Sequence, residues 1–292
     1  MVAVPGLRGE PEKMAMKQVL VGTLRHGEQE YEQCVRALHR QRGVSFDHFT
    51  LSDLPNKAAH DALYRQFMDS AAGYGYFLKL DADMVFRDSS GLAIMVKEIA
   101  EENGAHLFMD VLDWPSQMPI PGVQMFRSDC LWRGSDDRLN VDYAPALHGP
   151  LRRDFSTTLV DHMPNPSKFQ AFRYGIHKAL KAAQPDRRDK NFPKALTHAT
   201  ILAGIARHWR LTRDERLLFA LIGAMLVFRT RAKDLLDDYA GGPATDRFER
   251  LLSDPNALAK LTREAEDFWQ NEIQFFLGWY SYLPDAVWGL PS

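Results

Sequence analysis

The sequence predicts an α/β protein: a mainly parallel sheet flanked by helices, followed by an α-helical C-terminal subdomain. Over residues 18–126, short apolar runs alternate with helical segments, a pattern typical of parallel, right-handed α/β units. Acidic residues follow the second and third apolar runs, where ligands of such sheets bind. Beyond residue 189, helical patterns replace strand patterns. These three observations fix the predicted fold class.

The strands are predicted from apolar or alternating runs, and the helices from apolar residues three or four positions apart. The first run, "QVLVGT", indicates a buried strand, and "VSFDHFTLSD" alternates as a second strand. Tyr31, Cys34 and Leu38 share one face of the helix between these two strands. The predicted strands are residues 18–23, 44–53, 76–80, 105–114 and 122–126, and the predicted helices are residues 28–41, 57–72 and 91–103.

The chain divides into three predicted parts. Residues 1–17 form an N-terminal tail, residues 18–188 the sheet domain, and residues 189–292 the helical C-terminal subdomain. The boundary lies near the polar segment "QPDRRDKNFP". In the last part, "LTHATILAGIARHW" and "RFERLLSDPNALAKL" have the spacing of helices and contain no strand signal.

Composition limits the classes of protein to which the chain can belong. The 292 residues carry a net charge of −2, so no broad basic surface for nucleic acid is indicated. The two cysteines, Cys34 and Cys130, predict no disulfide framework and fit a reducing compartment. The N-terminus lacks the apolar core of a secretory signal. We therefore expect a cytoplasmic protein.

The longest uncharged apolar run, residues 217–228, has twelve residues, fewer than the roughly 18–20 needed to span a bilayer. Arginines flank this run. A helix buried in a core and a helix lying at the cytoplasmic face of a membrane both fit this pattern, so peripheral membrane contact through the C-terminal helices stays open.

The stretch "YFLKLDADMVF", residues 76–86, places two acids after a segment suited to burial. In an extended strand, Asp81 and Asp83 share one side and Ala82 faces away. Two neighbouring carboxylates repel each other unless a cation or hydrogen-bond donors compensate. Mg²⁺ and Mn²⁺ prefer oxygen ligands, and Mg²⁺ often joins carboxylates to substrate phosphates. The pattern predicts a metal site for a phosphorylated ligand, with solvated aspartates as the simpler alternative.

Four segments together resemble the GT-A glycosyltransferases of the family 2 type. "VLVGTLRHGEQEYEQCVRALHRQ" is similar to their opening strand and helix, and "FDHFTLSDLPNKAAHDALYRQF" to their second strand, its terminal acid and the following helix. "YFLKLDADMVF" resembles their D-x-D strand, and "PGVQMFRSD" a later strand. The resemblance covers residues 18–130 and implies a GT-A, Rossmann-like fold. The helical C-terminal part is not a standard element of that family.

The resemblance implies a glycosyltransferase, hexosyltransferase-like, that moves a sugar from a nucleotide-diphosphate-sugar donor to a glycan or lipid-linked acceptor. It implies Mn²⁺ or Mg²⁺ as cofactor. The implied nucleotide-binding residues are Thr23, Arg25, Asp53, Lys57 and Asp81, and the implied metal-binding residues are Asp81, Asp83 and His162. His148 competes with His162 for the role of the metal-binding histidine.

In that family an acid follows the "MFR" strand and acts as the base for the acceptor hydroxyl. By spacing, the segment "RGSDDRLNVDYAP" places Asp142 first and Asp137 second in this role, with Asp136 beside them. Asp110 and Asp113 on the fourth predicted strand are further candidates. The Glu-Asp pair usual in the family is absent here.

Two other classes of function fit parts of the sequence. "LKLDADMV" also matches the signature of haloacid-dehalogenase-type phosphatases, in which Asp81 is the nucleophile and Asp83 the general acid. Two strand–helix units precede the motif here, whereas that family opens with it. A non-catalytic α/β scaffold whose helical part binds a partner is the second alternative.

Overall fold

The structure is a computed structural model, and it describes residues 17–101, 103–133, 151–154, 158–183, 192–230 and 242–272. The strands are β1 (Lys17–Arg25), β2 (Phe46–Ser52), β3 (Tyr74–Lys79), β4 (Met84–Phe86), β5 (His106–Asp113), β6 (Met118–Arg127), β7 (Leu151–Asp154) and β8 (Val160–His162). The helices are α1 (Tyr31–His39), α2 (Asn56–Asp69), α3 (Gly91–Glu101), α4 (Lys168–Ala182), α5 (Phe192–Thr212), α6 (Glu215–Thr230), α7 (Pro243–Ser253) and α8 (Pro255–Asp267), with short turns η1 (Ala71–Gly73) and η3 (Phe268–Glu272).

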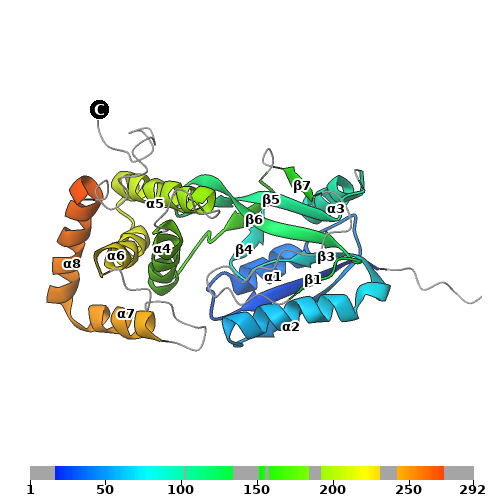
Figure 1. Cartoon of the computed structure of the whole chain (residues 1–292), viewed down its shortest axis with the longest axis horizontal. Coiled ribbons are helices and arrows are strands. Elements are labelled where there is room, and N and C mark those ends of the chain that lie inside the picture. Colours follow the sequence, from blue (N-terminus) through cyan, green and yellow to red (C-terminus); the bar gives the residue numbers. More distant parts are fainter. Residues whose placement is uncertain are drawn as a thin grey trace, which may run out of the picture.

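All eight described strands belong to one sheet, with the order β2-β1-β3-β6-β5-β8-β4 and β7 beside β5. β2, β1 and β3 are parallel to one another, and β5, β7 and β8 run in the same direction. β6 and β4 run the opposite way. The predicted mainly parallel α/β sheet is therefore confirmed, and Figure 1 shows the helices packed around it.

Helices cover both faces of the sheet because side chains of a strand alternate between its faces. Val19 and Val21 of β1 belong to the core that includes α1 and α3. Leu20 and Leu24 of β1 belong to a second core, built with α2. The predicted helix at residues 57–72 forms this second layer.

The strands β5 and β6 form an antiparallel hairpin, which the alternation of the first strands with helices did not indicate. Trp114 and Gln117 mark the ends of the short connection between them. A connection of this length closes an antiparallel pair, because a parallel crossover needs a dozen or more residues. β6 is also longer than the predicted strand at residues 122–126. The hairpin brings Asp113 to the same region of the sheet as β8.

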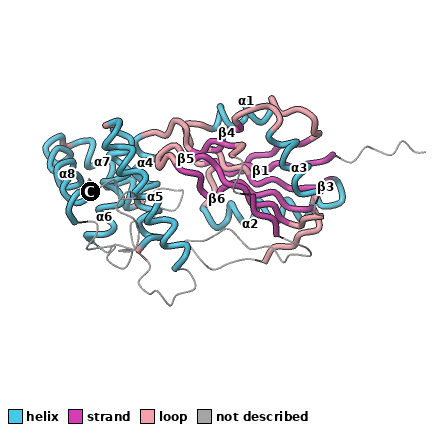
Figure 2. Tube along the Cα trace, turned by 90° about the horizontal axis from the view of Figure 1, so that it is seen from above, coloured by secondary structure: helices cyan, strands magenta, loops and turns pink. Residues whose placement is uncertain are grey.

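The helical part of the chain packs beside the sheet, as Figure 2 shows. Helix α4 lies directly against α6, and the two backbones approach closely at Gly175 and Gly223. A Cβ atom at Gly175 would lie 1.8 Å from the carbonyl oxygen of Ala220, and one at Gly223 would lie 2.4 Å from that of Phe172. The two glycines thus permit a contact that no larger residue allows.

The apolar run at residues 217–228 lies in helix α6 and is buried. Of the two interpretations of this run, the structure therefore shows the helix buried in a core. No helix in the described part of the chain is both long enough and apolar enough to cross a membrane. Apolar residues of α4, α5 and α6 share one core with β5 and β8. The division at residue 189 stays a prediction, although α4, which precedes it, packs with the later helices.

Candidate functional site

The candidate site lies where the parallel strands β1, β2 and β3 end. The backbone N–H of Asp53, after β2, donates to the carbonyl oxygen of Arg25 at 3.1 Å. The N–H of Ala82, after β3, donates to the carbonyl oxygen of Leu24 at 3.3 Å. The structure therefore brings Arg25, Asp53 and the Asp81–Asp83 segment to one edge of the sheet, as the α/β pattern predicts.

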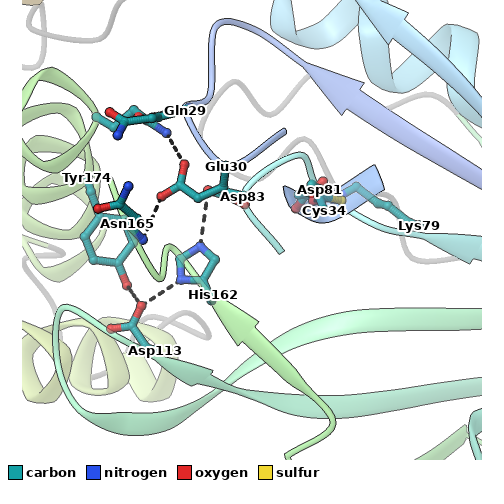
Figure 3. A network of polar contacts seen from close by, with 11 residues as sticks. Gln29, Glu30, Cys34, Lys79, Asp81, Asp83, Asp113, His162, Asn165 and Tyr174 are labelled. Carbon is teal, nitrogen blue, oxygen red and sulfur yellow. Dashed lines mark hydrogen bonds and ion pairs between the residues drawn. The ribbon is translucent and has the colours of Figure 1, made fainter. Parts of the chain in front are cut away.

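The segment Asp81–Asp83 is a turn, and not the extended continuation of the predicted strand 76–80 in which the two acids would share one side. β3 ends at Lys79, and the backbone N–H of Met84 donates to the carbonyl oxygen of Asp81 at 3.0 Å. Because the backbone turns here, the two carboxylates do not share a side as they would in a strand. Figure 3 shows Asp81 beside Lys79 and Cys34, whereas Asp83 faces His162.

Each of the two carboxylates has a cationic partner within the protein. Lys79 Nζ lies 3.0 Å from Asp81 Oδ1, and the side chain of this lysine is 6% exposed. His162 Nε2 lies 3.5 Å from Asp83 Oδ2. The repulsion expected between the two acids is thus offset by a lysine and a histidine.

His162 stands between two carboxylates. Its Nδ1 atom lies 2.7 Å from Asp113 Oδ1, on the side opposite Asp83. Asp113 is fully buried and also accepts a hydrogen bond from the hydroxyl of Tyr174 at 2.9 Å. The network Asp83–His162–Asp113–Tyr174, shown in Figure 3, therefore joins the D-x-D turn to β8, β5 and α4.

The charges of this network support one another. Burial opposes the charge on His162, but the carboxylates of Asp83 and Asp113 outweigh it and raise the pKa of His162 from 6.5 to about 10. Burial likewise opposes the charge on Asp83 and Asp113, yet contact with His162 holds the pKa of each carboxyl below its ordinary value. The network is therefore two carboxylates around an imidazolium at neutral pH.

Asp83 retains capacity for a ligand, because its buried Oδ1 atom has no hydrogen-bond partner among the described residues. An unpaired buried carboxylate oxygen is costly. His162 Nε2 faces the same carboxylate, and its Nδ1 is held by Asp113, which is how a metal-binding histidine is usually oriented. Asp83 and His162 therefore fit two ligands of a divalent cation, which would displace the proton from Nε2.

In the described ranges, no three His, Cys, Asp or Glu side chains are grouped as a complete metal site. A cation beside Asp83 and His162 would take its remaining ligands from water or a bound ligand, as Mg²⁺ does with substrate phosphates. Of the three predicted metal-binding residues, the structure brings Asp83 and His162 together and pairs Asp81 with Lys79. A part for Asp81 in metal binding stays a prediction.

Two further acids, Glu28 and Glu30, lie near the site and were not predicted. Glu30 accepts hydrogen bonds from the backbone N–H of Asn165 at 3.2 Å and from Gln170 Nε2 at 2.9 Å. Burial, and then the nearby charges of Asp83 and Asp81, raise the pKa of Glu28 to about 7. Both acids follow β1 in "RHGEQE", so their position after a strand was the available signal.

The predicted nucleotide-binding residues have different surroundings. Arg25 is exposed, and its guanidinium lies 4.2 Å from the centre of the Tyr31 ring. Thr23 is buried, and its hydroxyl is 3.0 Å from His48 Nε2. Asp53 Oδ1 is 3.6 Å from His26 Nδ1. Arg25 and Asp53 thus lie together at the strand ends, whereas Thr23 lies inside the sheet.

The remaining predicted residues bear less directly on the site. Lys57, on α2, forms an ion pair of 3.0 Å with Asp61. The predicted bases Asp137 and Asp142 lie outside the described residues, as do Asp136 and His148. Asp113, an outside candidate for the base, is instead hydrogen-bonded to His162.

No protein-family model matches the sequence, and no curated protein matches it. Among solved structures, the chain is similar to the mannosyltransferase PcManGT from Pyrobaculum calidifontis, in complex with GDP-Man and Mn²⁺. The two chains are 13% identical, the similarity covers 89% of each, and the TM-score is 0.36. Similarity at this level carries no argument about function, which is inferred below from the site itself.

Proposed function

We propose that the protein is a metal-dependent glycosyltransferase that moves a sugar from a nucleotide-diphosphate-sugar donor to a glycan or lipid-linked acceptor. The observation that carries the proposal is the pair Asp83 and His162 at the strand ends. Asp83 offers a buried carboxylate oxygen that has no hydrogen-bond partner in the described part of the chain, and His162 Nε2 faces the same carboxylate at 3.5 Å. The family 2 GT-A resemblance of residues 18–130 supports the same class of reaction.

Asp83 and His162 would hold Mn²⁺ or Mg²⁺, with Asp81 as the further predicted ligand. The cation would supply positive charge to the diphosphate as it leaves the sugar. Arg25 and Asp53 would bind the nucleotide, since they lie together at the ends of β1 and β2. Thr23 and Lys57 stay predicted nucleotide contacts on the strength of the resemblance.

In the proposed reaction, the acceptor hydroxyl oxygen forms a bond to the anomeric carbon of the donor sugar. The bond between that carbon and the diphosphate oxygen breaks, and the nucleoside diphosphate leaves with the electron pair. The hydroxyl proton passes to a carboxylate. Asp142, and after it Asp137, are the predicted acceptors of this proton.

The phosphatase alternative is less well supported by the same residues. It requires Asp83 to donate a proton, but the neighbouring His162 outweighs the effect of burial and holds the pKa of Asp83 below its ordinary value. A general acid for neutral pH needs a raised pKa. A phosphatase assay with generic substrates separates the two functions.

The proposed function is tested by thermal unfolding with uridine, guanosine and cytidine diphosphates, each with and without Mn²⁺. A ligand at 100 times its dissociation constant adds about 2.7 kcal/mol to the free energy of unfolding. We expect one nucleotide to stabilise the protein, and only with Mn²⁺. The variant Asp83→Ala should fold but lose both this stabilisation and sugar transfer.

The variant Asp161→Ala is the matched control, because Asp161 precedes His162 on β8 but pairs with Arg87, 3.5 Å away. It should keep the metal-dependent stabilisation. A protein that none of the three diphosphates stabilises with Mn²⁺ would favour the non-catalytic scaffold. Sugar transfer retained by Asp83→Ala would exclude the role given to this residue.

A further inference from the structure

Helix α4 presents a polar stripe to the acids of the candidate site. Gln170, Tyr174 and Lys178 are four residues apart and so lie on one face of the helix. Gln170 Nε2 donates to Glu30, and the hydroxyl of Tyr174 donates to Asp113 at 2.9 Å. The ammonium of Lys178 lies 4.6 Å from the centre of the Tyr174 ring. α4 therefore contacts acids on two different elements of the sheet domain.

The orientation of the Asp113 carboxylate is fixed from both sides. Its Oδ2 atom accepts hydrogen bonds from the backbone N–H of Ser116 at 3.0 Å and from the Ser116 hydroxyl. Its Oδ1 atom accepts from the hydroxyl of Tyr174 and faces His162 Nδ1 at 2.7 Å. Because a carboxylate only accepts hydrogen bonds, Nδ1 of His162 must carry a proton. Nε2 is then the nitrogen that faces Asp83.

We propose that Asp113 is the positioning residue for His162, and that Tyr174 of α4 holds Asp113 in its orientation. Asp113 holds a proton on Nδ1 of His162, so Nε2, which is directed at Asp83, is the nitrogen that would give up its proton when a cation binds. Helix α4 thereby has a function in the site. The positioning role itself does not depend on the proposed function. Only the experiment that measures metal binding rests on that function.

The packing of α4 supports this assignment. Gly175 follows Tyr174 and brings α4 against the backbone of α6, where a Cβ atom would lie 1.8 Å from the carbonyl oxygen of Ala220. At its N-terminus, α4 is closed by a capping box between Ser167 and Gln170. These contacts hold the backbone of α4 that carries Tyr174.

The variant Asp113→Asn tests the proposal, because asparagine keeps the shape but changes one acceptor into a donor. The backbone N–H of Ser116 requires an acceptor, so the amide oxygen should face Ser116 and the NH₂ group should face His162. Nδ1 of His162 must then accept, so the ring loses its Nδ1 proton and keeps only the proton on Nε2. The same substitution of Asp47, which accepts from Tyr74 at 2.6 Å, is the matched control away from His162.

The first readout is the proton resonance of the His162 Nδ1–H group in the metal-free protein, assigned by its loss in His162→Gln. We expect this resonance in the wild type and in Asp47→Asn, and not in Asp113→Asn. The second readout is the affinity for Mn²⁺ in the presence of the nucleoside diphosphate that stabilises the protein. Loss of such a supporting partner typically weakens metal binding roughly 10- to 100-fold.

The two readouts separate the inference from the proposed function. An Asp113→Asn protein that keeps the Nδ1–H resonance would overturn the positioning role. If the resonance is lost as expected but the wild type binds no Mn²⁺, the positioning role stands and the proposed function fails. If Asp113→Asn does not fold, the variant Tyr174→Phe tests the positioning role instead. It removes one donor from Asp113, so the Nδ1–H proton should exchange faster with water.

Tyr74→Phe is the control for Tyr174→Phe, since it removes another tyrosine hydroxyl that donates to an aspartate, here Asp47. It should leave the His162 resonance and its exchange rate unchanged. An exchange rate in Tyr174→Phe equal to that of the wild type would overturn the role given to Tyr174.

Discussion

Lys79 Nζ lies 3.0 Å from Asp81 Oδ1, and the side chain of Lys79 is almost completely buried. This contact explains why an apolar strand contains a lysine and ends in two acids. The lysine neutralises the first acid and His162 the second. The charges of the D-x-D turn are therefore balanced within the protein, and Asp83 still offers an oxygen without a hydrogen-bond partner among the residues that the structure describes.

Replacing Lys79 by methionine should destabilise the protein, because Asp81 loses its cation and stands near a second acid. We expect a loss of about 1–3 kcal/mol in the free energy of unfolding, less than for a fully buried pair because Asp81 is partly exposed. Urea denaturation measures the change. The double variant Lys79→Met/Asp81→Asn should recover most of the loss. A double variant as unstable as Lys79→Met would show that the ion pair is not the cause.

Glu28→Gln should stabilise the protein above pH 7 and change it little below pH 4.5. The folded protein raises the pKa of Glu28 to about 7, so stability is lost as the pH rises from 4.5 to 7. A neutral glutamine avoids this loss, which corresponds to about 3 kcal/mol. Melting temperatures of the variant and the wild type at pH 4 and pH 8 measure the effect. Glu32→Gln, an exposed acid on α1, should give no comparable gain.

The sequence predicted the parallel part of the fold well, because its apolar runs and helical spacing are local properties. β1, β2 and β3 and the helices between them lie close to their predicted positions. Local patterns do not show where strand pairing stops, however. Apolar residues continue on both sides of Asp81 and Asp83, so the turn between β3 and β4 was taken for an extended strand.

Contacts between distant segments account for what the sequence did not predict about the site. Asp83 and His162 were grouped through the family resemblance, and they do meet. The partnership of His162 with Asp113 depends on the β5–β6 hairpin, and that of Asp113 with Tyr174 depends on the packing of α4 beside the sheet. Neither contact has a signature in the spacing of the residues.

Gly175→Ala should destabilise the protein strongly, because its Cβ atom would meet the backbone of α6 at Ala220, which cannot move aside. We expect the free energy of unfolding to fall by about 1–3 kcal/mol or more, because 1–3 kcal/mol is the usual cost of overpacking. Gly73→Ala is the matched control, since no atom lies within 4 Å of a Cβ atom there. Urea denaturation of both variants measures the difference. Equal stabilities would contradict the close packing of α4 on α6.

The free energy of unfolding of the metal-free wild type should fall as the pH rises from 6.5 to about 10. The folded protein raises the pKa of His162 to about 10, because Asp83 and Asp113 outweigh the effect of burial. Within this range the unfolded chain releases the proton of His162 and the folded protein keeps it, so folding becomes less favourable as the pH increases. Tyr174 and Lys178 also face this network. Both residues are unchanged in the two variants compared with the wild type below, His162→Gln and His177→Gln.

His162→Gln removes the titrating group and should abolish this part of the pH dependence, although it lowers stability at neutral pH by leaving Asp83 and Asp113 without a cation. His177→Gln is the control. His177 lies on α4, one turn after Arg173, and burial holds the pKa of His177 well below its ordinary value. His177 therefore stays neutral across the range, and its loss should leave the slope unchanged. Denaturation at several pH values between 6.5 and 10 compares the three proteins, and a wild-type slope in His162→Gln would rule out the imidazolium between the two carboxylates.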